Sequence, residues 1–198
     1  MINKIFFLIK NNTKIKIILN FLIFKFKSIF YKRKIKIFKK NNQKILSRKK
    51  ISNDYFSMNA FNFFQYLSKL KNNFNYLEIG SYEGNSAMFV AKNFPNCKVL
   101  CVDNWVSTED YYGQDFNIVE SNFDQNIKEF KNIIKIKNNS DNFFSGNNYN
   151  FDVIYIDGYH KDNQVLRDCE NSWKILNNDG IMICDDYFWN FYENIENN

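Results

Sequence analysis

The sequence predicts an α/β fold in which a parallel β-sheet carries helices on both faces. From about residue 53 onward, short apolar runs alternate with stretches of helical periodicity, a pattern typical of strand–helix–strand units. The run Val153–Ile156 is continuously apolar, as expected for a strand that is buried on both sides. Each apolar run also ends in a polar or acidic residue, which indicates a functional edge of the sheet.

Each expected element follows from a local pattern. Apolar residues recur at helical spacing from Phe61 to Leu70, and Asn53 or Ser57 can cap this first helix. The Asn/Ser-rich segment 138–150 is expected to be a loop. In chain order we expect a helix over 57–71, a strand over Asn75–Ile79, a helix over Ser86–Asn93, a strand over Val99–Val102, a helix over Phe116–Phe130, strands over Ile133–Ile136 and Phe151–Ile156, a helix over Asn163–Leu176 and a strand over Ile181–Cys184.

Charge divides the 198-residue chain into two parts. Residues 1–50 hold 16 of the 27 basic residues and no acidic one, since Asp54 is the first carboxylate. The remainder holds 11 basic and 21 acidic residues, a net charge of −10. We therefore expect a basic, apolar arm over 1–52 and an acidic domain over 53–198, and an anionic partner for the arm rather than for the domain.

The arm favours a membrane surface over a membrane span. Its longest uncharged apolar run is Ile17–Phe24, whereas a spanning helix needs about 20 apolar residues. Basic and apolar residues together suit an anionic lipid surface. The alternative is a helical or disordered leader that packs on its own domain or on a partner. Nucleic acid is disfavoured, because the arm's aromatic residues form no stacking-module pattern.

The four cysteines do not form a CxxC pair, and His160 is the single histidine, which disfavours a structural zinc site. Cys101 and Cys184 lie within apolar runs and are expected to be buried, reduced thiols. Nothing in the cysteine pattern indicates an oxidising compartment, so a cytoplasmic location is expected, with peripheral membrane association through the arm.

Parallel sheets bind ligands in the crevice beyond the carboxyl ends of their strands. Aromatic residues near this edge could wall an acceptor pocket or simply pack: Trp105, Tyr111, Tyr112, Tyr187, Phe188 and Trp189. The polar strand ends, in chain order, are Glu78–Gly80, Asp103-Asn104, Asn139–Asp141, Asp157–His160 and Asp185-Asp186.

The turn after the first strand, Glu78–Ser86, reads EIGSYEGNS. Its glycines, Gly80 and Gly84, let the backbone approach a ligand closely. The turn does not match GxGxxG, which disfavours a nicotinamide oxidoreductase. A carboxylate before the turn and another at Asp103 suit a ligand with a cationic group and a ribose diol.

Four segments follow in order over residues 74–189: EIGSYEGNS, VDNW, FDVIYIDGYH and NNDGIMICDDY. With them the sequence resembles the class I S-adenosylmethionine-dependent methyltransferases. It is most similar to the small-molecule O-methyltransferases of the catechol and sugar (macrocin-like) type. The resemblance implies a Rossmann-like sheet and methyl transfer from S-adenosylmethionine to a hydroxyl of a small molecule or sugar.

The resemblance also implies which residues bind the cofactor. Gly80 and Gly84 would form the turn beneath it, with Ser81 in the same turn. Asp103 would bind the ribose hydroxyls, and Ser140 would lie near the adenine. Positions that contact the methionine part are matched by Glu78, Tyr82 and Ser86, although turn packing and helix capping are equally open for Tyr82 and Ser86.

Asp157, Asp185 and Asp186 end two strands that neighbour each other in such a fold. Carboxylates that close together repel, and a divalent cation relieves the repulsion. Oxygen ligands suit Mg²⁺ rather than zinc. The catechol-type enzymes carry Asp, Asp and Asn at these positions, so Asp186 departs from their pattern. The alternative is that Asp185 caps the strand end and that Asp186 is solvated.

His160 stands three residues after Asp157, where related enzymes place a Lys or, in the sugar-type members, a His. The resemblance implies that it takes the proton from the acceptor hydroxyl, with Asp157 beside it as a second catalytic residue. An imidazole has a pKa suited to this role near neutral pH. A structural or metal-orienting histidine is the alternative.

Related chains continue past the fifth strand with a helix and an antiparallel hairpin, whereas this sequence ends twelve residues after Asp186. We therefore expect a sheet that lacks the C-terminal hairpin and leaves the edge of its fifth strand open, which favours a homodimer. A rival to the enzyme is an inactive, membrane-associated binding module with a truncated methyltransferase fold.

Overall fold

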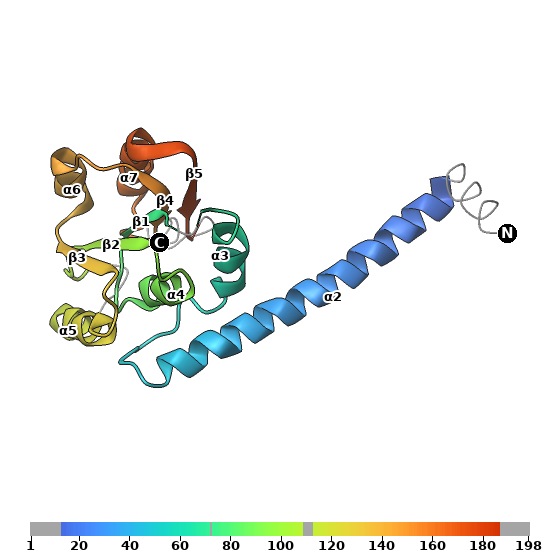
Figure 1. Cartoon of the computed structure of the whole chain (residues 1–198), viewed down its shortest axis with the longest axis horizontal. Coiled ribbons are helices and arrows are strands. Elements are labelled where there is room, and N and C mark those ends of the chain that lie inside the picture. Colours follow the sequence, from blue (N-terminus) through green and yellow to red (C-terminus); the bar gives the residue numbers. More distant parts are fainter. Residues whose placement is uncertain (1–12, 72, 109–112, 187–198) are drawn as a thin grey trace, which may run out of the picture.

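The computed structural model describes residues 13–71, 73–108 and 113–186 (Figure 1). All five strands pair in parallel to form one sheet, in the order β3-β2-β1-β4-β5. The elements are α2 (Thr13–Leu46), α3 (Ala60–Leu67), β1 (Asn75–Ile79), α4 (Asn85–Asn93), β2 (Lys98–Asp103), α5 (Phe116–Ile127), β3 (Ile133–Lys137), α6 (Ser140–Gly146), β4 (Phe151–Ile156), α7 (Asp162–Ile175) and β5 (Leu176–Cys184).

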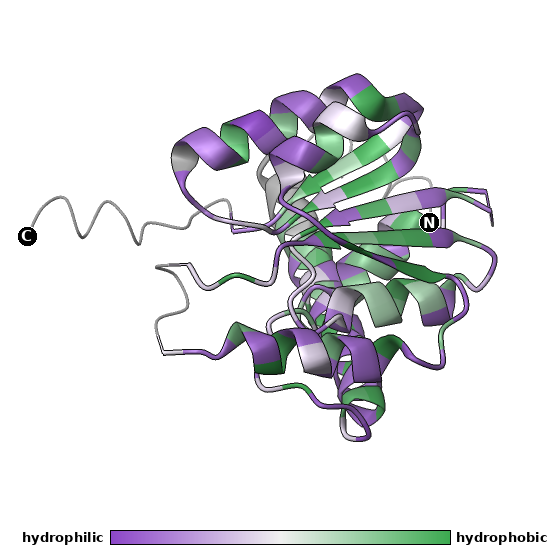
Figure 2. Ribbon diagram, turned by 90° about the vertical axis from the view of Figure 1, so that its left-hand side faces the viewer, coloured by the Kyte–Doolittle hydropathy of each residue, from purple (hydrophilic) through white to green (hydrophobic). Residues whose placement is uncertain are grey.

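Helices cover both faces of the sheet, as predicted. On one face, α3, α4 and α5 pack around Tyr155, Phe123 and other buried side chains (Figure 1). On the other face, α6 and α7 cover a smaller apolar cluster that includes Ile154 and Phe143. The hydropathy colouring in Figure 2 shows apolar strands between helices whose outer surfaces are largely polar. The central strands are therefore buried on both sides, which explains their continuous apolar runs.

Three predicted elements differ from the structure by more than a few residues or in kind. Helix α3 covers only the middle of the predicted span 57–71, and its N-cap residue is Asn59, whose side chain makes no cap bond. Strand β5 begins at Leu176, directly after α7. The loop prediction for 138–150 was wrong in part, because α6 lies within it. Asn139 caps α6 by accepting a hydrogen bond from the Asn142 N–H at 2.7 Å.

The predicted burial of Cys101 is confirmed, but that of Cys184 was wrong, because its thiol is exposed. Cys184 is the last residue of β5, and β5 is an edge strand of the sheet.

Among the described residues, β5 is the only strand after β4, and it pairs with β4 in parallel. None of the helices in the described ranges is long and apolar enough to cross a membrane.

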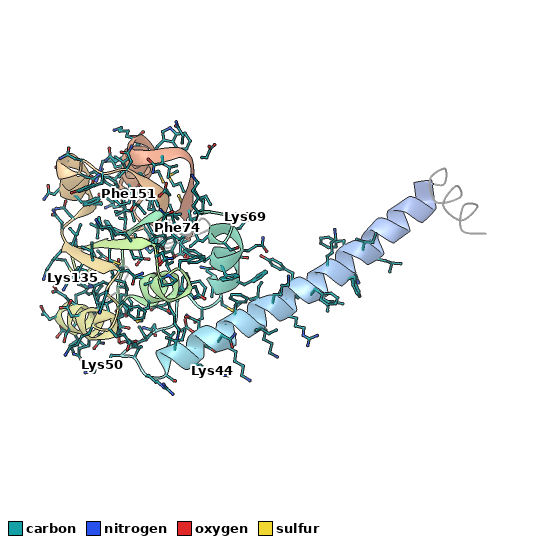
Figure 3. All side chains as sticks on the ribbon, viewed as in Figure 1. Lys44, Lys50, Lys69, Phe74, Lys135 and Phe151 are labelled. Carbon is teal, nitrogen blue, oxygen red and sulfur yellow. The ribbon has the colours of Figure 1, made fainter. Side chains whose placement is uncertain are left out.

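The arm is helical over Thr13–Leu46, and its two halves have different surroundings. Its outer half projects away from the domain, and from Phe21 onward its described side chains spread into open space (Figures 1 and 3). Its inner half packs on the domain. Phe38 contacts Phe61 and Phe64, with ring centroids 5.4 and 5.0 Å apart, and Leu46 is buried. The division at 52/53 remains a prediction, since these contacts cross it.

A polar clamp fastens the segment after α2 to the domain. The side chain of Asn126 on α5 accepts from the Lys50 N–H at 2.7 Å and donates to the carbonyls of Lys50 at 2.9 Å and Glu83 at 3.0 Å. The buried carboxylate of Glu83 accepts from the N–H and hydroxyl of Ser52. The clamp satisfies backbone groups that no helix or strand pairs.

Replacing the clamp amide should therefore destabilise the domain. We expect Asn126→Ala to lower the free energy of unfolding by about 2–3 kcal/mol, because it leaves the carbonyl of the buried residue Glu83 and two backbone groups of Lys50 without these partners. Urea denaturation followed by circular dichroism measures this loss. Asn117→Ala, at an exposed position of the same helix, should change stability by less than about 0.5 kcal/mol. Equal effects of the two changes would show that the clamp does not stabilise the fold.

Candidate active site at the carboxyl edge of the sheet

The turn between β1 and α4 presses against the loop that follows β4. Gly80 has φ +84°, and a Cβ there would lie 2.1 Å from the Asp157 carbonyl oxygen and 2.6 Å from the Gly158 Cα. Only glycine fits such an approach. Gly84 also has φ +84°, and a Cβ there would lie 3.1 Å from the Phe123 ring. The two glycines thus set the path of the turn at the centre of the sheet edge.

Asp103, the last residue of β2, holds this turn from the other side. Its Oδ2 accepts from the N–H groups of Ser81 at 2.9 Å and Tyr82 at 3.0 Å, and its Oδ1 accepts from the Trp105 N–H at 2.8 Å. Burial raises the pKa of Asp103, while these backbone hydrogen bonds oppose the rise. The carboxylate is therefore fixed in place before any ligand arrives.

Glu78 and Ser86 lie behind the turn rather than beside the cleft. Glu78 is fully buried, and burial raises its pKa to about 8, although a hydrogen bond from the Tyr76 hydroxyl at 3.0 Å opposes the rise. Ser81 is also buried and contributes its N–H to Asp103. These residues shape the turn, and a direct contact with a cofactor remains a prediction for each of them.

A cleft of about 170 Å³ opens along the edge between the ends of β1, β2, β3 and β4. Of the residues predicted to bind the cofactor or to act in catalysis, five line the cleft: Gly80, Tyr82, Asp103, Ser140 and Asp157. The sequence analysis missed residues that loops, the start of α5 and α7 contribute to the cleft; among them are Thr108, Phe116, Asn138, Gln164 and Asp168.

Gln164 and Asp168 are four residues apart on α7, a spacing that places both on one helix face. Gln164 Nε2 donates to the Ser140 hydroxyl at 3.0 Å and to Asp168 Oδ1 at 3.0 Å. Asp168 is buried, and burial raises its pKa. Both residues lie on the face of the helix that is expected to pack on the sheet. Polar residues at such a position were a sequence signal for this side of the cleft.

Three potential metal ligands converge beside the cleft: Asp157, His160 and Asp186. Their ligand atoms all lie within 4.8 Å of one another. His160 Nε2 is 3.2 Å from Asp186 Oδ2 and 3.9 Å from Asp157 Oδ1. Burial raises the pKa of Asp157 to about 6, and it also raises that of Asp186. Two carboxylates and one imidazole are a donor set that suits a divalent cation.

Asp185, predicted as the third ligand, faces a different group of residues. Its Oδ2 accepts from the Tyr155 hydroxyl and from Asn59 Nδ2 at 3.1 Å, and its Oδ1 accepts from the Asp186 N–H at 2.9 Å. The Tyr155 hydroxyl also lies 2.7 Å from Asp157 Oδ2. His160 thus stands in the cluster where Asp185 was expected, and metal ligation by Asp185 remains a prediction.

A second cavity, of about 450 Å³, lies between α3 and β5. Phe63, Tyr66 and Ile183 give it apolar walls, while Asn62 and Asp185 add polar groups. Trp105, suggested as an acceptor-pocket residue, packs instead in the core, and its Nε1 donates to the Tyr82 carbonyl at 2.9 Å. The other five suggested aromatic residues lie outside the described ranges.

Comparisons with known proteins agree with this architecture. A model of the methyltransferase domain family matches residues 77–187. The fold resembles that of a proposed caffeoyl-CoA O-methyltransferase from Staphylococcus aureus, with a TM-score of 0.53 and 20% identity over 83% of this chain and 73% of that one. No curated protein matches the sequence.

Two further structures share the fold. A proposed O-methyltransferase from Klebsiella pneumoniae matches with a TM-score of 0.52 and 15% identity, over 76% of this chain and 63% of that one. A precorrin-6y C5,15-methyltransferase from Geobacter metallireducens matches with a TM-score of 0.52 and 11% identity, over 69% of this chain and 65% of that one. At these identities the structures establish the fold, whereas the family model spans more than half of the sequence. The chain therefore belongs to the methyltransferase domain family.

Proposed function

We propose that the protein transfers a methyl group from S-adenosylmethionine to a hydroxyl of a small molecule or sugar, assisted by Mg²⁺. The observation that carries the proposal is the fixed turn between Asp103 and the β4 loop. A backbone turn without side-chain bulk at Gly80, beside the half-buried carboxylate of Asp103, suits a ligand with a ribose diol and a cationic group.

The cleft residues divide the binding of S-adenosylmethionine between them. Asp103 would accept hydrogen bonds from the ribose hydroxyls, and Ser140 would lie beside the adenine. Tyr82, from the turn itself, would border the methionine part. Bound S-adenosylmethionine supplies an activated methyl group, and the task of these residues is to hold that group in line with the acceptor oxygen.

Asp157, His160 and Asp186 would hold the divalent cation next to the cleft. A bound cation orients a hydroxyl and makes its proton easier to remove. His160 has two possible roles in this arrangement: it is either a ligand of the cation or the base that takes the acceptor proton. The cavity between α3 and β5 lies next to Asp185, and its mixed apolar and polar lining suits an acceptor that carries both a ring and hydroxyl groups.

The rival proposal is an inactive binding module. Such a protein would bind S-adenosylmethionine in the same cleft but would not transfer the methyl group. Binding of S-adenosylmethionine without methyl transfer to any hydroxylated acceptor would favour it. The same measurement separates both proposals from a protein that does not bind S-adenosylmethionine at all.

We also propose that the outer half of α2 contacts an anionic membrane surface. Phe21, Leu22, Ile23 and Phe24 are consecutive and between 44 and 69% exposed, so apolar side chains cover the whole circumference of the helix. Helix α2 carries eleven basic residues and no acidic one. Lysine stems can lie along apolar surface while their ammonium groups reach lipid phosphates. An anionic lipid surface would therefore be the anionic partner that the basic charge of the arm predicts.

Asp103→Asn should weaken the binding of S-adenosylmethionine about tenfold. The change keeps an acceptor oxygen but replaces a charge-assisted hydrogen bond with a neutral one. Titration calorimetry with S-adenosylmethionine measures the dissociation constant, and the melting temperature checks that the turn is intact. Asp115→Asn, at the exposed N-cap of α5, should bind as the wild type does. An undiminished affinity in the Asp103 variant would remove the proposed ribose contact.

Divalent cation binding should depend on Asp186 and on pH. We expect Asp186→Asn to weaken Mg²⁺ or Mn²⁺ binding at least tenfold, while Asp179→Asn, on β5 and exposed, has no effect. Asp157 has a pKa of about 6 and must lose its proton to bind a cation, so affinity should fall as the pH drops below 6. Calorimetry at pH 5 and pH 7.5 tests both points. Affinity that is independent of pH and of Asp186 would place the cation elsewhere.

His160→Gln separates the two roles of the histidine. Loss of cation binding together with turnover would identify a ligand. Intact cation binding with turnover lowered roughly 10²–10⁴-fold would identify the base. Methyl transfer and calorimetry on the same sample give the two readouts, once an acceptor has been found.

The double change Phe24→Ser and Ile29→Ser should reduce binding to phosphatidylserine-containing vesicles at least tenfold, because it removes two exposed apolar side chains of α2. Vesicle sedimentation measures the bound fraction, and added salt should lower it. Leu166→Ser, at an exposed apolar position of α7, is the matched control. If vesicles bind neither form and the wild type self-associates through α2, the partner of the arm is a second copy and the membrane proposal is wrong.

A further inference from the structure

Cys169 and Cys184 come from different elements and meet at the surface. Cys169 lies on α7 and Cys184 ends β5, and their Sγ atoms are 3.6 Å apart. Cys184 is exposed and Cys169 is half-buried, whereas Cys97 and Cys101 are buried. The chain thus has two kinds of thiol, and only one pair is in mutual contact at a solvent-accessible position among the residues described.

We propose that Cys169 and Cys184 form a reversible dithiol–disulfide site that locks α7 to the end of β5. Two sulfurs in contact need to approach from 3.6 Å to the bonding distance of about 2.05 Å, a movement that side-chain rotation can supply. Helix α7 and strand β5 already pack on each other, so the bond would join neighbouring elements rather than draw distant ones together.

The oxidant is a low-molecular-weight disulfide. A thiolate of the pair attacks one of its sulfurs, its S–S bond breaks, and one small thiol leaves as a mixed disulfide forms on the protein. The second protein thiol then loses its proton and attacks the protein-bound sulfur of that mixed disulfide. The second small thiol leaves. In total, two protein thiols and one small disulfide become one protein disulfide and two small thiols, and excess small thiol reverses the exchange.

Exposure and contact suit the pair to exchange. Cys184 is exposed, so a small disulfide can reach its sulfur, and the half-buried Cys169 thiol lies in contact with it. The contact between the sulfurs gives the second step the advantage of proximity once the first adduct has formed.

The site stands beside the proposed cation ligands but does not depend on them. Cys184 directly precedes Asp185, and α7 begins two residues after His160. A bond between Cys169 and Cys184 would therefore tie together the two elements that flank the acidic cluster. Its formation can be measured without any cofactor, cation or acceptor, so its failure would leave the methyl-transfer proposal untouched.

Mass mapping of the full chain tests the proposal. The protein is incubated with oxidised glutathione, its free thiols are alkylated, and it is digested with trypsin. We expect peptides 168–174 and 175–198 to be joined, with the loss of two hydrogen atoms, and reactive thiols in the unfolded protein to fall from four to two. Dithiothreitol should restore all four. Cys169→Ser and Cys184→Ser should each abolish the joined peptides, whereas Cys97→Ser should not.

Thermal unfolding provides the second measurement. Oxidised wild type should melt several degrees higher than reduced wild type, because the bond restricts the unfolded chain. The shift should be absent in Cys184→Ser. A stable glutathione adduct on Cys184 without joined peptides, an unreacted protein, or joined peptides that contain Cys97 would each overturn the proposal. The mapping of wild-type peptides decides the matter even if a serine variant fails to fold.

Discussion

The close contact between the β1–α4 turn and the β4 loop is the constraint on which the rest of the site depends. A Cβ at Gly80 would overlap the Asp157 carbonyl oxygen at 2.1 Å, so the turn reaches the loop only as bare backbone. The strand order changes direction between β1 and β4, and ligands in such sheets bind at this point. Through this one contact, the residues proposed to hold the cofactor and those proposed to hold the cation become neighbours.

The strands were predictable because each depends on its own apolar run, and all five were located. The helix ends were less predictable, because a polar side chain at a helix end can bond either to the nearby backbone or to a residue far away in the sequence. Asn139 caps α6 locally, and an asparagine before a short polar helix was a readable signal. Asn59 stands at the N-cap of α3, yet its amide bonds Asp185. No local pattern reveals that choice, because the partner is 126 residues away.

The composition of the acidic cluster shows a similar limit. Asp185 and Asp186 are adjacent at the end of β5, and successive side chains of an extended chain point to opposite sides. Two neighbours therefore cannot be assumed to reach the same cation. Here Asp186 has a positive φ of +50° and lies near His160, while Asp185 lies near Tyr155 and Asn59. The sequence correctly predicted that both aspartates follow β5. Which way each side chain points depends on the backbone conformation of Asp186.

Tyr155 gives a reason why this edge needs a positive charge. Its hydroxyl has one proton, yet it lies within hydrogen-bond distance of both Asp157 and Asp185, so it can donate to only one of them at a time. The other carboxylate either keeps its own proton or needs a cation nearby. Burial favours the protonated form of Asp157, whose pKa is about 6. At neutral pH that proton is mostly lost, and the remaining negative charge is what His160 or a divalent cation would neutralise.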